Sequence, residues 1–415
     1  MSNFDNYVYF QEGPGLTSNL FAESGFPFIN IRCIENNKLN KKNVQFISDK
    51  IANTIYKHFK IESGDILLST SGSLGKKVKI ENQDLPLMLN TSIMRFRSKN
   101  TNDLINEYLF YYLESRHLLK QVEKEAQGSA QVNLGPTHFK KFDIYLPNLP
   151  TQKRIATILS TVDGQIEKTE AIIAKYQAIK QGMLHDLFTR GIDLSTGMLR
   201  PTQEQAPELY KPSPLGLIPK CWDVDMLENL TDKIGSGVTP TGGSEIYRKE
   251  GVLFLRSQNI LINKLDISDV AYISNKIDES MFSSSVKRFD VLLNITGASI
   301  GRCAFFPENL DRANVNQHVC IIRFTTHYLE NSIFASEYIN SPFIQNQIST
   351  LNAGGNREGL NYQQIKSFWF PILPQDEILK IVHIINQVNS KLRNEQNALN
   401  KLQKLKQGLM VGLLK

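Results

Sequence analysis

Apolar residues recur along two stretches of the chain in steps that alternate between four and three, the spacing of a coiled-coil seam. Each stretch follows a proline, Pro150 or Pro374, which is common in the first turn of a helix. The pattern predicts helices at residues 150–190 and 374–415, each of about 40 residues and roughly 60 Å. The seam positions are Ile155, Leu159, Val162, Ile166, Thr169 and Ile173 in the first stretch, and Ile381, Ile385, Val388, Leu392, Glu395, Leu399 and Leu402 in the second.

Two helices of equal length and heptad phase are self-complementary. Packing them against each other buries both seams at once, so we expect a coiled coil within the chain. The alternative is that each helix buries its apolar seam on its own domain.

Ahead of each helix lies a longer segment of short apolar runs punctuated by Gly, Asn and Ser, typical of strands joined by turns. The runs include residues 28–31, 65–68 and 291–293, and helical patches intervene at 106–125 and 332–350. We predict an α+β domain at residues 1–149 and another at 213–373. Residues 191–212 form the linker between the first helix and the second domain. From Gly191 to Pro219 the chain holds five prolines and no apolar periodicity, so we expect an extended, exposed segment.

A constant offset of 226 residues relates the two halves. The sequence therefore predicts an internal repeat, in which each copy has an α+β domain followed by a long helix. A protein with an internal repeat usually has two equivalent binding sites. The offset pairs Lys180-Gln181-Gly182 with Lys406-Gln407-Gly408, Gly75 with Gly301, Asn90 with Asn316, and Arg97 with Arg323.

Composition sets the broad class. At 415 residues the chain exceeds one ordinary domain, and 41% hydrophobic with 21% charged residues describes a folded protein. A net charge of +6 permits a polyanionic partner without requiring one. Four widely spaced cysteines argue against a zinc ribbon or a disulfide framework and favour reduced thiols in the cytoplasm. We find no signal peptide and no apolar run of about 18 residues, so we expect no membrane span.

The sequence lacks the motifs of the common catalytic sites. There is no H-E-x-x-H, no phosphate-binding G-x-x-x-x-G-K-[ST], and no N-P-P-aromatic stretch of an amino-methyltransferase. The histidines are scattered, and none pairs in sequence with a cysteine, serine or acidic cluster. We therefore expect no catalysis and no metal site.

The strongest candidates for binding are two glycine-rich turns at equivalent places in the repeat. In each, a buried strand leads into a turn rich in hydroxyl groups, whose second glycine is followed by a cation. Such a turn exposes backbone N–H groups and suits a phosphate, although an ordinary turn with a solvated cation is about equally consistent. The candidate residues are Ser71, Gly72, Ser73, Lys76 and Lys77 in the first copy, and Thr296, Ser299 and Arg302 in the second.

Two further pairs of segments are candidates. Asn90 and Asn316 each lead into a strand that ends in Arg97 or Arg323, and these residue types can read base edges or phosphates. Asn is equally common as the cap of a turn. A third pair of polar loops precedes the last strand of each domain and offers Gln131 and Asn133, or Asn356 and Arg357. Exposed loops on a rigid scaffold often carry recognition residues, but a plain connecting loop is the alternative.

The order and duplication of these elements resemble the specificity subunit of Type I restriction-modification enzymes. The resemblance covers nearly the whole chain. The matching stretches are residues 9–15, 64–76, 128–134, Leu149-Pro150-Thr151-Gln152 with the four residues that follow, Lys180 to Leu184, and Ile218-Pro219-Lys220-Cys221-Trp222.

The resemblance implies that each α+β domain is a target recognition domain for one half of a split DNA sequence. It implies that the two helices are the family's conserved regions, packed antiparallel as a ruler in a pseudo-two-fold repeat. The partners would be double-stranded DNA, two methyltransferase subunits and restriction-translocase subunits, with S-adenosylmethionine, ATP and Mg²⁺ bound on those subunits. The chain itself would have no catalytic centre and bind no cofactor, and it would act in host defence.

One departure concerns the start of the repeat. The second half opens with residues 214–223, and the 226-residue offset puts their counterpart before Met1. We therefore expect the first recognition domain to lack its opening strand.

Three functions remain open. The first is a non-catalytic, sequence-specific DNA-binding subunit. The second is a coiled-coil scaffold that binds proteins and no DNA, and the third is a fused nuclease-methyltransferase, against which the missing motifs argue. DNA binding that requires two half-sites would separate the first from the others.

Overall fold

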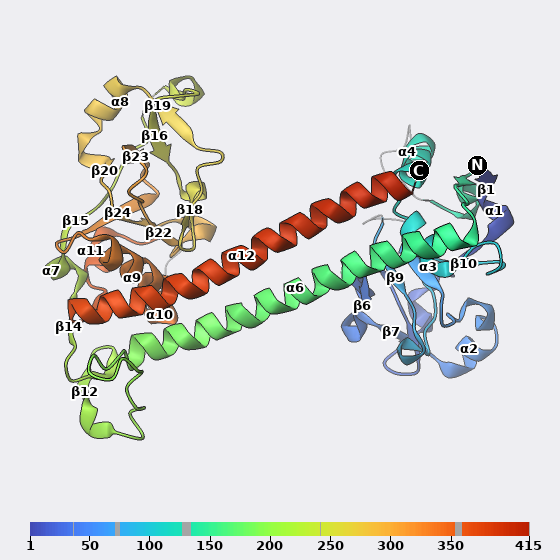
Figure 1. Cartoon of the computed structure of the whole chain (residues 1–415), viewed down its shortest axis with the longest axis horizontal. Coiled ribbons are helices and arrows are strands. Elements are labelled where there is room, and N and C mark those ends of the chain that lie inside the picture. The colour runs from blue at the N-terminus through green and yellow to red at the C-terminus, as the bar shows by residue number, and fades with distance from the viewer. Residues whose placement is uncertain (36, 71–74, 127–133, 241, 353–358, 415) are drawn as a thin grey trace. The chain divides into compact units, whose positions relative to one another are not determined.

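The computed structural model describes residues 1–35, 37–70, 75–126, 134–240, 242–352 and 359–414 (Figure 1). The chain forms two compact units, unit 1 from Met1–Ile172 and Glu395–Lys415, and unit 2 from Ile173–Asn394. The unit boundary falls inside each of two long helices, α6 (Leu149–Thr189) and α12 (Gln375–Leu413). Each unit thus contains one α+β domain, the start of the helix that follows it, and the end of the other helix.

The centre of unit 1 is an antiparallel sheet with the order β2-β10-β8-β9. Its strands are β2 (Val8–Glu12), β8 (Ile66–Ser69), β9 (Lys77–Lys79) and β10 (Ile93–Ser98). Around it lie β1 (Ser2–Asn3), α1 (Phe4–Tyr7), β3 (Phe21–Ala22), β4 (Phe26–Phe28), β5 (Ile34–Glu35), β6 (Lys38–Leu39), β7 (Gln45–Ile47), α2 (Asp49–Asn53), α3 (Asn106–Tyr112), α4 (Arg116–Ala126), α5 (Pro136–Phe139) and β11 (Asp143–Ile144).

The apolar run in β8 is continuous because the sheet is covered on both faces. Successive side chains of a strand point to opposite faces. Ile66 and Leu68 accordingly pack in one core with Tyr108 and Phe139 from the helices, whereas Leu67 packs in a second core with Ile29.

Unit 2 repeats this sheet, with the order β15-β24-β21-β22. Its strands are β15 (Thr231–Ser236), β21 (Val291–Asn294), β22 (Cys303–Phe305) and β24 (Val319–Phe324). Val291 and Leu293 again pack in one core and Leu292 in another. The other elements are β12 (Tyr210–Ser213), β13 (Gly216–Pro219), β14 (Asp223–Met226), α7 (Leu227–Leu230), β16 (Val252–Leu255), β17 (Ile260–Leu261), β18 (Lys264–Leu265), β19 (Ala271–Ile273), α8 (Asn275–Ser280), β20 (Ser285–Val286), β23 (Ala313–Val315), α9 (Leu329–Ile339), α10 (Pro342–Asn352), α11 (Tyr362–Lys366) and β25 (Trp369–Ile372).

The two long helices predicted from the heptad pattern are present and pack together in each unit (Figure 1). In unit 1 the start of α6, with Ile155 and Leu159, shares a core with Leu409 and Leu413 near the end of α12. In unit 2 the end of α6 and the start of α12 share a core in the same way. A start that meets an end in both units makes the pair antiparallel.

The apolar seam residues of both helices are buried or partly buried. The ends of the two helices also pack on the domain cores. Each seam is therefore buried partly against the other helix and partly on a domain, so both alternatives apply. The buried positions are Ile155, Leu159, Val162, Ile173, Ile381, Ile385 and Leu399, and the partly buried ones are Ile166, Val388, Leu392 and Leu402.

The predicted linker is mostly exposed, as expected, but it is not extended, because turns and a short helical segment interrupt it and parts of it are anchored. Ile192 and Tyr210 are buried, and β12 and β13 form a hairpin that the prolines do not prevent. The segment is held by the buried carboxylate of Glu377 in the first turn of α12, which accepts hydrogen bonds from Arg200 and from the backbone N–H of Ile192. Apolar periodicity does not reveal this anchoring, because isolated apolar residues such as Ile192 and the polar contacts of Glu377 provide it.

The expected absence of an opening strand in the first domain is wrong. Two residues, Ser2 and Asn3, form β1 and pair antiparallel with β11. In unit 2 the longer strand β14 pairs with β25 in the same arrangement. A strand in the position of β14 is therefore present in unit 1. The 226-residue offset missed it because α1 and α7, which follow these strands, start at Phe4 and Leu227, an offset of 227 − 4 = 223 residues.

Candidate nucleic-acid interface

Four strand ends meet at one edge of each central sheet. Because neighbouring strands are antiparallel, β2 and β8 end at the edge where β10 and β9 begin. In unit 2, β15 and β21 end where β24 and β22 begin. We call this edge, with the loops after β2 and β8 and before β10 or their unit 2 equivalents, the loop edge.

The loop edge joins the three loop pairs that the sequence suggested separately. In unit 1 the Thr70 backbone N–H donates to the Ser92 carbonyl at 3.3 Å, and its carbonyl accepts from the Leu134 N–H at 3.1 Å. In unit 2 the Ile295 N–H donates to the His318 carbonyl at 3.0 Å, and its carbonyl accepts from the Leu360 N–H at 2.9 Å. Segments far apart in sequence therefore form one duplicated surface.

The glycine turn at this edge presents a cation to solvent in both units. Gly75 has φ 90° and Gly301 has φ 84°, a left-handed conformation that favours glycine. The Gly75 N–H donates to the Ser69 carbonyl at 3.2 Å, and the Gly301 N–H donates to the Asn294 carbonyl at 2.9 Å. The next residue, Lys76 or Arg302, has an exposed side chain. A glycine followed by an exposed cation is thus found at this place in both units, while Ser71, Gly72 and Ser73 of the first turn lie outside the described residues.

Lys77 is not part of this surface, so its selection as a DNA contact was wrong. Its side chain is fully buried. The Lys77 ammonium lies 3.1 Å from the Glu114 carboxylate and 3.8 Å from the centre of the Phe110 ring. Burial lowers its pKa from 10.5 to about 8, and the Glu114 carboxylate opposes this shift.

Arg97 and Arg323 also have internal partners. The Arg323 guanidinium binds both oxygens of the buried Asp290 carboxylate, at 2.7 and 2.6 Å. Arg97 pairs with Glu62 and lies 3.7 Å from the buried Asp65 carboxylate. Both arginines sit near the C-terminal ends of β10 and β24, away from the loop edge. Arg323 therefore neutralises a buried carboxylate and has a structural role. Arg97 is held mainly by Glu62, because the buried Arg95 lies closer to the Asp65 carboxylate, at 3.4 Å.

Asn90 and Asn316 act as turn caps, one of the two alternatives left open by the sequence. The Asn90 side-chain oxygen accepts from the Ser92 N–H at 3.0 Å, and that of Asn316 accepts from the His318 N–H at 3.0 Å. Both residues shape the loop edge from within, and Asn316 is buried.

The remaining candidates divide into placed and undescribed residues. Thr296 and Ser299 are half-buried at the loop edge, and the Thr296 hydroxyl lies 2.7 Å from Nδ1 of His318. Seven candidates lie outside the residues that the structure describes. These are Ser71, Gly72, Ser73, Gln131, Asn133, Asn356 and Arg357.

The loop after the first central strand was missed by sequence reasoning. A Cβ at Gly237 would overlap the Val315 carbonyl oxygen, so only glycine lets this loop pass against the sheet. Val238 beyond it is exposed, and the Thr239 hydroxyl bonds to Gln317 at the same edge. In unit 1, Gly13 makes the equivalent close approach to the Asn90 backbone. A glycine that directly follows a strand in both copies was the available signal.

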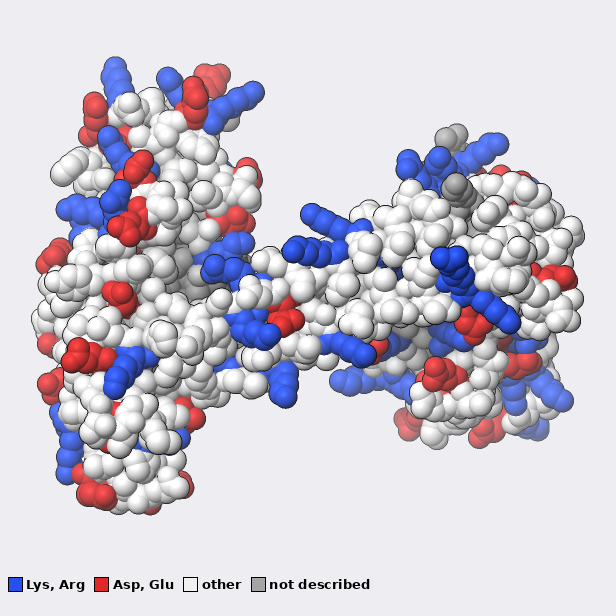
Figure 2. Space-filling model, in the orientation of Figure 1, with Lys and Arg blue, Asp and Glu red and all other residues white. Residues whose placement is uncertain are grey.

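The charge of the surface is mixed. In the face drawn in Figure 2, basic and acidic side chains are interspersed over the α+β domains, while the helix surfaces carry mostly lysine and arginine. Phosphate attraction would therefore depend on individual cations such as Lys76 and Arg302. Among the described helices, none is long and apolar enough to cross a membrane.

The fold and the duplicated loop edge define a class of protein with two similar α+β domains on paired antiparallel helices. The family model for the Type I restriction modification DNA specificity domain matches residues 8–177 and again residues 233–404. The chain belongs to this family. It is a non-catalytic specificity subunit of a Type I restriction-modification system and acts with the other subunits and with DNA.

Known relatives agree with this assignment. The chain is 25% identical to the MjaX type I restriction enzyme specificity subunit of Methanocaldococcus jannaschii, covering 96% of this chain and 89% of that one. It is 24% identical to the EcoBI specificity subunit of Escherichia coli, covering 78% and 68%. The crystal structure of the S subunit from M. genitalium has the same fold, with a TM-score of 0.58 and 15% identity over 100% of this chain and 95% of that one.

Proposed function

We propose that each unit reads one half of a bipartite DNA target through its loop edge. The duplicated loop edge, with one exposed cation on a glycine turn in each unit, carries this proposal. Lys76 and Arg302 would contact phosphates and so position the protein, because an exposed cation suits a phosphate oxygen.

Base discrimination would come from residues of the loop edge that differ between the units. Val238, Thr239 and Gln317 are exposed in unit 2, whereas Gly15 and Thr91 are exposed at the matching edge of unit 1. Different side chains on the same backbone frame suit two different half-sites.

The helices would set the distance between the half-sites and dock two methyltransferase subunits, and through them restriction subunits. S-adenosylmethionine, ATP and Mg²⁺ would be bound by those partners, with no cofactor on this chain. We expect the complex to act in the cytoplasm. A protein-binding scaffold without a DNA role is the competing function, and it gives no reason for a duplicated cation turn.

The test begins with methylation sequencing of host DNA with and without this gene, which identifies the target. The full chain, assembled with its methyltransferase subunits, is then titrated with target DNA and with scrambled DNA. We expect preference for the target, dependence on both half-sites, and weaker binding as salt rises. Equal affinity for scrambled DNA would refute the proposal.

The loop edge itself is tested by Lys76→Ala with Arg302→Ala. Each lost phosphate contact should make the negative slope of log affinity against log salt less steep by about 1, with little change in target preference. Lys42→Ala with Lys220→Ala is the matched control, because these lysines are exposed in the same units away from the loop edge. An unchanged salt slope in the first pair would remove the two cations from the interface.

A further inference from the structure

Near the end of each long helix, a lysine from the repeated Lys-Gln-Gly sequence reaches a carboxylate in the unit where that helix ends. In unit 2 the Lys180 ammonium lies 2.8 Å from the Glu337 carboxylate. In unit 1 the Lys406 ammonium lies 2.7 Å from the Asp163 carboxylate. The lysines are equivalent under the 226-residue offset, but the acids are not.

The acid has changed position between the two copies. Glu337 belongs to α9 of the recognition domain, and Asn389 of α12 donates to it at 3.1 Å. Asp163 belongs to α6 itself, and the Tyr111 hydroxyl of the recognition domain donates to it at 2.9 Å. The offset pairs Tyr111 with Glu337 and Asp163 with Asn389. Each unit therefore holds one acid and one neutral donor at the same two positions, in opposite order.

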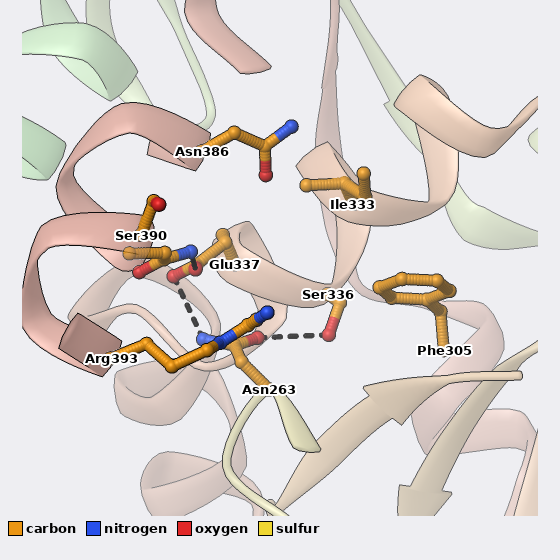
Figure 3. Close-up of a pocket in the computed structure, with 9 residues that line it drawn as sticks. Asn263, Phe305, Ile333, Ser336, Glu337, Asn386, Ser390 and Arg393 are labelled. Atoms are coloured by element: carbon orange, nitrogen blue, oxygen red, sulfur yellow. Dashed lines mark hydrogen bonds between the residues drawn. The ribbon is translucent and has the colours of Figure 1, made fainter. Parts of the chain in front are cut away.

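We call Lys180, Glu337 and Asn389 the unit 2 lysine site, and Lys406, Asp163 and Tyr111 the unit 1 lysine site. The unit 2 site lies beside a cavity lined by Glu337, Asn263 and Arg393 (Figure 3). The Glu337 side chain is 4% exposed, and its second oxygen accepts from the Asn263 amide at 2.8 Å. A carboxylate this buried requires a cation and donors, so loss of Lys180 would leave Glu337 uncompensated and a second acid would have to share that lysine.

An apolar seam alone does not fix the register of two heptad helices. A slip of one heptad moves a helix by roughly 10 Å and still places apolar residues opposite one another. The same slip would leave the buried Glu337 carboxylate and the partly exposed Asp163 carboxylate without their lysines. Buried polar groups in coiled coils are known to specify register in this way, at a cost in stability.

We propose that Lys180 and Lys406 are positioning residues that fix each recognition domain and the two helices in one register. Each lysine pairs with one acid, which comes either from the recognition domain or from the first half of the helix that follows it. A recognition domain and the helix that follows it therefore form a matched set, in which one of the two supplies the acid and the other a neutral donor.

The unit 2 lysine site offers the sharper test, because both tryptophans, Trp222 and Trp369, lie in unit 2 and report its unfolding alone. Glu337→Gln removes the acid, Asn389→Asp adds a second one, and the double variant moves the acid to the helix as in unit 1. In the full chain we expect each single variant to lower the midpoint of thermal unfolding by about 5 °C. The double variant should recover more than half of that loss.

Asn386→Asp combined with Glu337→Gln is the matched control. Asn386 lines the same cavity one turn earlier on α12 (Figure 3). An acid there should not rescue Glu337→Gln. Additive losses in the Glu337→Gln, Asn389→Asp double variant, or equal rescue by Asn386→Asp, would overturn the proposal.

A second readout rests on the proposed function. If the lysine site fixes register, Glu337→Gln should relax the preferred spacing between DNA half-sites, and the double variant should restore it. A merely structural role would change stability without changing spacing, so unaltered spacing in a destabilised Glu337→Gln chain would reject the positioning role. If the chain shows no DNA preference at all, the proposed function fails, while the unfolding cycle still decides the matched set of acids.

Discussion

At Lys77 a charged group lies inside the core of unit 1. The Lys77 ammonium donates to the Phe110 carbonyl at 2.5 Å, lies beside the Glu114 carboxylate and faces two aromatic rings. These contacts compensate only part of the cost of removing the charge from water, which explains why burial lowers its pKa to about 8.

This shift predicts an unusual dependence of stability on pH. Between pH 8 and the ordinary lysine value of 10.5, the unfolded chain keeps a proton at Lys77 that the folded chain has released. The free energy of unfolding should therefore rise with pH over this range, by at most about 1.4 kcal/mol per pH unit from this group. The gain is fully developed above 10.5 and is lost as pH falls through about 8.

The measurement is denaturant unfolding at several pH values for the native chain and for Lys77→Met, with hydrogen exchange of β9 peptides to follow unit 1. The difference between the two proteins should slope with pH. Lys79→Met is the matched control, because Lys79 lies on the same strand but is partly exposed and paired with Glu107. A difference that stays flat from pH 7 to 10 would mean that Lys77 does not titrate as described.

Sequence patterns found the cation turn but could not separate its two lysines. Lys76 and Lys77 are adjacent, yet one is exposed and the other is enclosed by α3 and the residues after it. The distinction depends on Glu114 and Phe110, which lie more than 30 positions away in sequence. The same limit applies to Arg323, whose partner Asp290 is visible only once β21 and β24 are paired.

At the level of elements, Glu377 joins three parts of unit 2. It lies in the first turn of α12, where a carboxylate also favours the helix dipole. Its oxygens accept from the Arg200 guanidinium of the linker, from the Ile192 N–H after α6, and from the Trp222 indole N–H. One buried carboxylate thus anchors the linker on the helix start.

Replacing Glu377 by Gln should destabilise unit 2 by about 3–5 kcal/mol, because Arg200 is left as a largely buried, unpaired charge. The indole of Trp222 hydrogen-bonds to Glu377, so its fluorescence should shift at the same time. Thermal unfolding followed by tryptophan fluorescence measures both effects. Asp376→Asn is the matched control, since Asp376 is the exposed neighbour in the same turn. Equal stability of the two variants would show that the linker is held elsewhere.

The contrast between helices and linker explains what the sequence could predict at this scale. A heptad seam is a local, periodic signal, so α6 and α12 were predicted within two residues at each end. The linker fold depends on contacts between Glu377 and residues 155 to 185 positions away. No local pattern encodes such contacts.

For the whole molecule, comparison of the two units separates the structural features that both copies share from the surface residues that differ between them. The sheet order, the cation turn and the lysine sites recur in both units, whereas the exposed residues of the loop edge do not. The internal offset revealed the shared parts. It could not reveal that the acid of the lysine site had moved, because Tyr111 opposite Glu337 looks like an ordinary difference until the side chains are seen together.

The lysine sites make exchange of recognition domains conditional. A chain with residues 213–373 in place of 1–149, and α6 unchanged, brings the carboxylate of Glu337 against that of Asp163, where Lys406 pairs with a single acid in the native unit. We expect this chimera to unfold at a lower temperature than the native chain, by about 5 °C or more. Adding Asp163→Asn recreates the arrangement of unit 2 and should restore stability.

The same chimera tests recognition. With Asp163→Asn, and assembled with the methyltransferase subunits, it should methylate a target that contains two copies of the half-site read by unit 2. Methylation sequencing measures this directly, and the native chain with Asp163→Asn alone serves as the control. If the repaired chimera is stable but keeps the native target, the loop edge does not determine the half-site. If the chimera with Asp163→Asn is no more stable than the chimera without it, the proposal that the domain and its helix form a matched set is wrong, whichever DNA target the chimera recognises.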